Sequence, residues 1–294
     1  MMDAASYTAV LDEVRGLPWP ARRRVRGALP GPHPATARGT SAEFVEYRPY
    51  RQGDDPRKID WKLVARTDRV YVRLSPERAI LPTMVVIDAS GSMAFPLPGH
   101  GKWDQARQIT IALAAAARDA GDPVGLALSD ARGPRLVLPR TRRSVLEEMI
   151  RMLDVVPSGP AELAPAMGLA MRRAARVVLV SDFLGDAAAL LGLGRRFVAS
   201  GHELSVVHIV DPQELEPDTR QRLLADPEQP DYRRPMPPES WGEYRRRFAE
   251  WRTGLAADWS AASAGYHLVV TGSEPIRQVV RRITSIAGGA RRAL

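Results

Sequence analysis

Two apolar runs of this sequence lead directly into acidic and hydroxyl side chains. The first run is followed by Asp88, Ser90 and Ser92 at alternate positions, and a later run is followed by Ser181 and Asp182. Carboxylates and hydroxyls are hard oxygen ligands, which Mg²⁺ or Mn²⁺ accepts while it keeps bound waters and an open position. If the two runs lie side by side, Asp88, Ser90, Ser92 and Asp182 form a metal site whose open position can take a carboxylate from another protein.

Short aliphatic runs alternate with helical patterns from about residue 83 onward, which indicates βαβ units around a parallel sheet. Continuous apolar runs are typical of strands that are covered on both faces. In a doubly wound, mostly parallel α/β sheet, ligands bind beyond the carboxyl ends of the strands, where the acidic and hydroxyl side chains stand. We expect strands at residues 84–87, 125–128, 177–180, 204–210 and 267–270, and helices at about 103–119, 142–154, 163–175, 186–199 and 275–286.

The first part of the chain has a different character. Residues 1–80 are expected to form an N-terminal segment, with a short helix at 5–15 followed by a proline-rich basic arm. Further on, Asp55 is a good N-cap, and the proline after it suits the first position of a helix that runs to about Ala65. The dense arginine and aspartate pattern over residues 48–69 favours ion pairs within the segment over a docking surface.

Residues 81–294 are expected to form the α/β domain, interrupted by a proline-rich excursion at 212–240. The helix that follows begins with the capping pattern of Ser240 and Glu243, and its large apolar residues recur at spacings of three and four. Helical periodicity explains this stripe, so we expect it to pack on the sheet or on the N-terminal segment rather than to bind a ligand. The stripe consists of Trp241, Tyr244, Phe248, Trp251, Leu255 and Trp259.

The composition of the 294 residues excludes several classes of protein. Cysteine is absent, so disulfides and thiolate metal sites are impossible, and a reducing cytoplasm is the simplest compartment. The 42 basic against 34 acidic residues give a net charge of +8, but the arginines are interleaved with acids and lack an aromatic stacking pattern, which disfavours nucleic-acid binding. No apolar stretch is long enough for a membrane span, and charges break up any signal peptide in the first 25 residues. We therefore expect a cytoplasmic protein.

Two motifs carry a resemblance to known families. The string Asp88-Ala89-Ser90-Gly91-Ser92 after a strand, with Ser181-Asp182 after a later one, resembles the metal-ion-dependent adhesion site of von Willebrand factor A domains. The segment 43–74, EFVEYRPYRQGDDPRKIDWKLVARTDRVYVRL, is similar to the bacterial domain-of-unknown-function family 58, whose members are often encoded beside MoxR-type AAA+ ATPases. The resemblance covers about residues 27–285 and implies a von Willebrand A-like fold.

The resemblance also implies roles for the site residues. In the adhesion site the two serines, here Ser90 and Ser92, bind the metal directly, while the two aspartates usually reach it through water. A threonine from an intervening loop completes the set. Here Ala161 and Glu162 stand where relatives carry a Thr-Asp pair, so the threonine ligand is missing, and Ser158 or Glu162 is a possible substitute. We therefore expect a partly degenerate site for Mg²⁺ or Mn²⁺.

The leading hypothesis is a non-enzymatic adaptor that presents the strand-end loop to an acidic residue of a MoxR-type ATPase or of its client, in assembly or maturation of that client. The alternative is a metal-dependent hydrolase or phosphotransferase that uses Asp88 and Asp182 as ligands. It lacks an obvious general base, since Asp104 and Asp130 are the only nearby candidates. Arginine-driven nucleic-acid binding is a third and weaker hypothesis, and such binding would fall steeply with salt.

Overall fold

The computed structural model describes residues 4–22, 30–39, 46–67, 69–96, 101–185, 187–218, 223–225, 233–235 and 237–285. The chain forms two compact units, of which the larger contains residues 1–20 and 82–294 and the smaller contains residues 21–81. The expectation of one N-terminal segment over residues 1–80 is therefore wrong for its first twenty residues. Helix α1 (Ala4–Val14) belongs to the larger unit because Tyr7, Val10 and Val14 are buried in its core.

The larger unit is built on a six-stranded sheet with the order β11-β8-β7-β4-β5-β6. All neighbouring strands are parallel except β5 and β6, which are antiparallel, so the predicted doubly wound, mostly parallel α/β sheet is confirmed. The edge strand β6 was not predicted. The strands are β4 (Thr83–Asp88), β5 (Val124–Asp130), β6 (Gly133–Arg140), β7 (Arg176–Ser181), β8 (Glu203–Val210) and β11 (Gly265–Val270).

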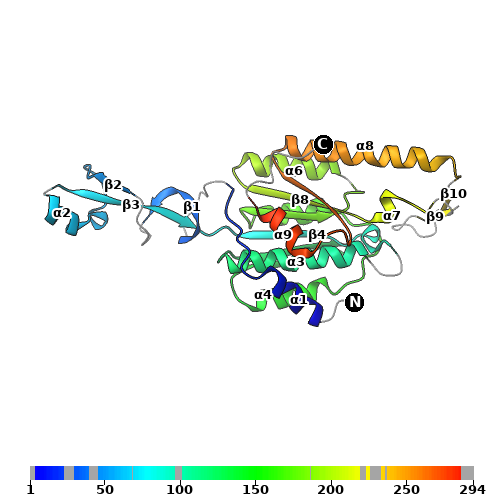
Figure 1. Ribbon diagram of the computed structural model, residues 1–294, viewed down its shortest axis with the longest axis horizontal. Coiled ribbons are helices and arrows are strands. Elements are labelled where there is room, and N and C mark those ends of the chain that lie inside the picture. The colour runs from blue at the N-terminus through cyan, green and yellow to red at the C-terminus, as the bar shows by residue number, and fades with distance from the viewer. Residues whose placement is uncertain are drawn as a thin grey trace. The chain divides into compact units, whose positions relative to one another are not determined.

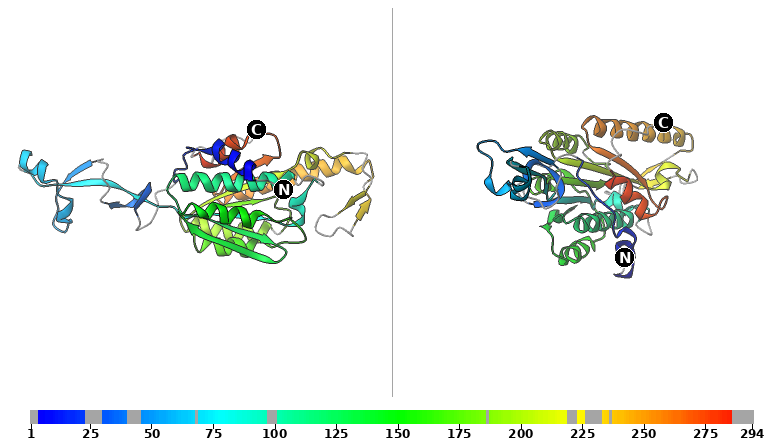
Figure 2. Two further views of the ribbon diagram at one scale, coloured as in Figure 1. Left: turned by 90° about the horizontal axis from the view of Figure 1, so that it is seen from below. Right: turned by 60° about the vertical axis from the view of Figure 1, so that its left-hand side comes forward.

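Helices cover both faces of the sheet (Figure 1). Side chains alternate along a strand, so Val85 and Ile87 of β4 enter one core cluster, whereas Met84 and Val86 enter the other. The first cluster packs under α1, α3 (Gly101–Asp119), α4 (Ser144–Leu153) and α9 (Ile276–Thr284), and the second packs under α5 (Leu163–Met171), α6 (Ala187–Ala199) and α8 (Ser240–Ala261). Two further views show the same layers from other directions (Figure 2). None of the helices in the described ranges is long and apolar enough to cross a membrane.

The C-terminal part of the aromatic stripe of α8 packs on the core as the periodicity predicted. Leu255 and Trp259 are buried in the second core cluster, and Trp251 packs against it. Towards the start of α8, the rings of Tyr244 and Phe248 are stacked with centroids 5.7 Å apart. The excursion before this helix contains α7 (Pro212–Leu215) and an antiparallel pair of short strands, β9 (Leu223–Ala225) and β10 (Arg233–Pro235).

The smaller unit has a three-stranded antiparallel sheet of order β1-β3-β2, formed by β1 (Pro30–Gly39), β2 (Glu46–Pro49) and β3 (Tyr71–Ala79). The single helix expected over 56–65 is instead a 3-10 turn, η1 (Pro56–Lys58), followed by α2 (Trp61–Thr67). Asp55 caps the turn as predicted, by accepting from the amide of Arg57 at 2.9 Å.

The break between these two pieces has a local cause. Asp60 accepts from the amides of Lys62 and Leu63, at 3.0 and 3.1 Å, and so starts α2 afresh. The expected ion pairs within this segment include one between Arg48 and Asp54, whose two hydrogen bonds measure 2.8 and 2.6 Å. Of the basic arm, Arg23, Arg24 and Arg26 lie outside the described residues.

Arg176, the first residue of β7, forms a buried cluster at the amino-terminal ends of the strands. Its guanidinium donates to Glu203 at 3.1 Å and to Asp122 at 3.4 Å, and it lies 4.4 Å from the centre of the Trp19 ring. It also donates to the carbonyl oxygen of Pro20 at 3.2 Å. The backbone amide of Arg176 donates to the carbonyl of Pro82 at 3.1 Å. The chain leaves the larger unit after Pro20 and re-enters it at Pro82, and the carbonyls of both prolines therefore accept hydrogen bonds from Arg176.

Candidate metal and partner site at the strand ends

Asp88 and Ser181 end the neighbouring strands β4 and β7, as the sequence predicted. The hydroxyl of Ser181 donates to Asp88 Oδ2 at 2.7 Å, and the backbone amide of Ser90 donates to Asp88 Oδ1 at 2.9 Å. Both oxygens of the buried carboxylate thus accept a hydrogen bond from the protein itself. Such a carboxylate is well placed to reach a metal through a bound water rather than directly.

Ser90 and Ser92 lie on the loop after β4, where the chain forms a 3-10 turn, η2 (Gly91–Ala94). Their hydroxyl oxygens are 3.1 Å apart, and both residues are buried. Adjacent ligands of an octahedral Mg²⁺ at 2.0–2.1 Å are separated by about 3.0 Å. The spacing of the two hydroxyls therefore fits two neighbouring positions of one such ion.

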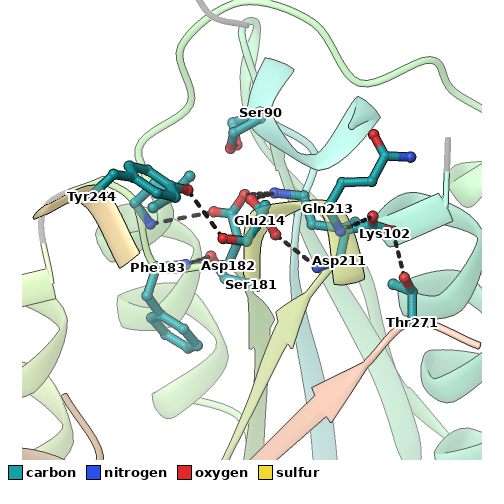
Figure 3. Close-up of polar contacts among 12 residues, drawn as sticks. Ser90, Lys102, Ser181, Asp182, Phe183, Asp211, Gln213, Glu214, Tyr244 and Thr271 are labelled. Atoms are coloured by element: carbon teal, nitrogen blue, oxygen red, sulfur yellow. Dashed lines mark hydrogen bonds and ion pairs between the residues drawn. The ribbon is translucent and has the colours of Figure 1, made fainter. Parts of the chain in front are cut away.

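Asp182 lies in the same region but is engaged by a residue that the sequence reasoning missed. Lys102, the second residue of α3, places its Nζ 2.7 Å from Asp182 Oδ2 and 2.8 Å from Glu214 Oε1 (Figure 3). The side chains of Lys102 and Asp182 are only 1% and 3% exposed. The other oxygen of Asp182 accepts from the amide of Leu184 at 3.3 Å. A buried ion-pair network thus adjoins the predicted metal ligands.

Glu214 is held in this network by the short helix α7. Asp211 and Glu214 form a capping box, in which Glu214 Oε2 accepts from the amide of Asp211 at 2.7 Å. The hydroxyl of Thr271 donates to Asp211 Oδ2 at 2.5 Å and ties the start of α7 to the end of β11. The sequence signal that could have found Glu214 is Asp211-Pro212-Gln213-Glu214, a helix start directly after a predicted strand.

The electrostatics of the site follow from burial and these contacts. Burial, followed by the charge of Asp182, raises the pKa of Asp88 to about 6, although the hydrogen bonds from Ser181 and Ser90 act against the rise. Burial alone would lower the pKa of Lys102, but Asp182 and Glu214 outweigh it, and the net shift is upward. Lys102 therefore carries a full positive charge beside the carboxylates. Burial also lowers the pKa of the nearby His208 to about 4, so this imidazole is neutral at physiological pH.

The loop expected to supply the missing threonine does lie against the site. The carbonyl of Gly159 accepts from the amide of Gly91 at 2.7 Å, which joins this loop to the serine loop. Ala161 and Glu162 line a cavity of about 340 Å³ together with Asp88 and Ser181. The rest of the lining is mostly apolar and includes Leu163, Pro165, Phe183 and Leu190. Ser158 and Glu162, the possible substitutes for threonine, are both exposed.

These residues fit a divalent ion in part. The serine hydroxyls have the right spacing, and Asp88 is placed for contact through water, but Asp182 is shared with an ammonium group. Within the described part of the chain, no group of three or more His, Cys, Asp or Glu side chains is arranged to hold a metal. Any ion at this site would thus depend on hydroxyls, water and an external ligand for most of its coordination.

Comparisons with known proteins agree with the family resemblance. Relatives described as uncharacterized proteins are found in Mycobacterium tuberculosis (Rv1480) and Mycobacterium bovis (Mb1516), each 28% identical over 286 residues, which cover 94% of this chain and 90% of the relative. Among solved structures, the conserved hypothetical protein BatB from Bacteroides thetaiotaomicron matches with a TM-score of 0.46 and 13% identity, over 70% of this chain and 98% of that one. The SpRpn10 VWA domain matches with a TM-score of 0.40 and 13% identity, over 73% and 100%. A sequence model described as "Protein of unknown function DUF58" matches residues 46–250, and the chain therefore belongs to this family.

Proposed function

We propose that this protein is a non-enzymatic interaction module that presents the strand-end loop of β4 to an acidic residue of a partner protein. The observation that carries the proposal is the pair of buried serine hydroxyls, 3.1 Å apart, at the carboxyl end of a central strand. When bound there, Mg²⁺ or Mn²⁺ would supply a Lewis-acidic position for a carboxylate. Ser90 and Ser92 would hold the ion directly, and Asp88 and Asp182 would act behind them.

The structure supports an interaction role more than a catalytic one. The two acids considered as general bases are both engaged elsewhere, since Asp104 accepts a hydrogen bond from Arg107 and Asp130 accepts one from Arg135 at 2.8 Å. Neither is a free base beside Asp88. The two acids that the sequence offered to a hydrolase or phosphotransferase are thus not free to activate water, whereas binding of a partner's carboxylate requires no general base.

The cavity beside Asp88 suggests how a partner gains affinity. Its polar lining residues are Asp88, Glu162 and Ser181, and its apolar lining includes Leu163 and Phe183. A partner that places an acidic residue on the metal could insert a neighbouring apolar side chain here, which would bury area without a further charge. The partner class that the family resemblance implies is a MoxR-type AAA+ ATPase or its client.

The test is a quantitative binding assay with a MoxR-type ATPase, in Mg²⁺ and in EDTA. Ser90→Ala/Ser92→Ala should weaken binding in Mg²⁺ by about tenfold or more, because both direct ligands are lost. Ser200→Ala/Ser260→Ala is the matched control, since Ser200 follows α6, Ser260 lies in α8, and both are exposed. Full affinity of the first variant, with its fold verified by circular dichroism, would exclude this loop as the interface. Turnover of phosphoester substrates that requires Asp88 would favour the enzyme instead.

A further inference from the structure

Lys102 is the feature of this site that the proposed function does not use. Its side chain is only 1% exposed, yet it carries a positive charge in contact with Asp182, which is one of the predicted metal ligands. We infer that Lys102 is a resident cation that competes with a divalent metal for Asp182 and so sets the metal affinity of the strand-end site. This inference rests on the proposed function and concerns the regulation of the same site.

The first argument is that the ammonium group is fixed in place. Asp182 and Glu214 approach it at 2.7 and 2.8 Å from the segments that follow two different strands, β7 and β8. The ring of Phe95 lies 5.6 Å from Nζ and adds a cation–π contact. A lysine on a surface samples many rotamers, but here α3, α7 and the loop of Phe95 hold the ammonium group against Asp182.

The second argument is that Asp182 has little capacity left. Its Oδ2 accepts a charge-assisted hydrogen bond from Lys102, and its Oδ1 accepts from the amide of Leu184 at 3.3 Å. A divalent ion, or a water that it binds, can reach this carboxylate only through the remaining lone pair of Oδ1, or by displacing Lys102 from Oδ2 or sharing Oδ2 with it. Charge-assisted hydrogen bonds between buried groups are among the strongest polar contacts, so displacement is unfavourable.

The third argument concerns charge. Asp88, Asp182 and Glu214 bring three acidic groups to the site, and Lys102 offsets one of them. An incoming dication is attracted by the carboxylates and repelled by the ammonium, and both effects are large because the groups are shielded from water. A partner's carboxylate would add negative charge on the exposed side of the metal. Metal and partner would then each raise the affinity of the other, since such coupling is reciprocal.

The test compares Mn²⁺ affinity, measured by calorimetric titration without any partner, in the wild type and in Lys102→Met/Glu214→Gln. This double variant keeps the net charge and removes the ammonium from Asp182, while the side-chain oxygen of the new glutamine can still accept from the amide of Asp211. Glu214→Gln removes the charge that loss of the ammonium would otherwise strand at Glu214. Asp182 keeps its charge, which becomes available to the metal, so circular dichroism must first show that the variant is folded. We expect the double variant to bind Mn²⁺ about tenfold more tightly than the wild type.

The result that overturns the inference is equally specific. If Lys102 instead positions Asp182 for the metal, the double variant will bind Mn²⁺ more weakly than the wild type. Equal Mn²⁺ affinities of the two proteins, or no binding by either, would show that Lys102 does not limit metal binding. Lys102→Met alone should also bind more tightly, provided that it folds, and the exposed Lys62→Met is the control that should change nothing. Partner binding by the serine double variant is a separate measurement, so failure of the proposed function is distinguishable from failure of this inference.

Discussion

The hydroxyl of Ser181 donates to the carboxylate of Asp88 at 2.7 Å and joins the ends of two neighbouring parallel strands. The same hydroxyl oxygen accepts from the amide of Phe183 at 2.9 Å. Since the amide can only donate, the hydroxyl proton is left for Asp88. The backbone of the β7 loop therefore determines which way the hydroxyl points, and Asp88 receives a donor that favours its ionised form even though the site is buried.

Asp88 should make the stability of the metal-free protein fall with rising pH. Its pKa is about 6 in the folded protein against an ordinary value of 3.8, so the folded state binds more protons than the unfolded state between these values. Stability contributed by the protonated carboxyl is present below about pH 4 and is lost as the pH rises through about 6. The amount is on the order of 2 to 3 kcal/mol.

The corresponding experiment is urea unfolding of Asp88→Asn and wild type in EDTA at several pH values. The amide does not ionise, so the variant should be the more stable protein at pH 8, by about 2 kcal/mol, and the difference should shrink towards pH 4. A stability difference that does not change with pH would contradict the raised pKa. Mn²⁺ should stabilise the wild type and not the variant.

Ala161→Thr should raise the affinity for Mg²⁺ or Mn²⁺. Ala161 lines the cavity beside Asp88, and a hydroxyl at this position would restore the donor that the resemblance implies is missing. Ala164→Thr is the matched control, because Ala164 lines the same cavity from α5. Calorimetric titration of both variants measures the change in metal affinity. No gain for Ala161→Thr would mean that another group already supplies this ligand.

Gly194→Ala should destabilise the protein, whereas Gly192→Ala should not. A Cβ at Gly194 would lie 2.6 Å from Trp259 Cζ3 and 2.8 Å from Leu204 Cδ2, in the packed core under α8. Overpacking of this kind costs roughly 1 to 3 kcal/mol. A Cβ at Gly192 meets its nearest atom, Arg196 Nη1, at 4.0 Å, so alanine there should stabilise α6 by about 0.5 to 1 kcal/mol. Thermal unfolding of the two variants measures both, and equal effects would refute the packing argument.

The sequence was informative where periodicity decides structure. The alternation of strands and helices placed Asp88 and Ser181 correctly, because the carboxyl ends of parallel strands meet at one edge of the sheet. The metal role of Asp88, Ser90, Ser92 and Asp182, the identity of the ion and the MoxR-type partner stay predictions.

The features that were missed have physical reasons. The contacts of Lys102 join residues separated by 80 and 112 positions, so no local sequence pattern predicts them. Strand β6 contains Pro134 and Pro139, which argue against a strand unless it lies at the edge of a sheet, as this one does. The break at Ile59 that divides the expected helix combines the local cap by Asp60 with a backbone pairing of Ile59 and Val72 of β3, and this pairing joins residues far apart in the sequence.

The double attachment at Arg176 makes residues 21–81 an inserted cassette. Because the carbonyls of Pro20 and Pro82 both accept hydrogen bonds from this one residue, the ends of the interruption lie beside each other on the larger unit. The sheet order and the strand-end loop are then independent of the length and content of the cassette. Evolution could lengthen, trim or exchange it without disturbing the register of β4, provided that Arg176 and its acidic partners are kept.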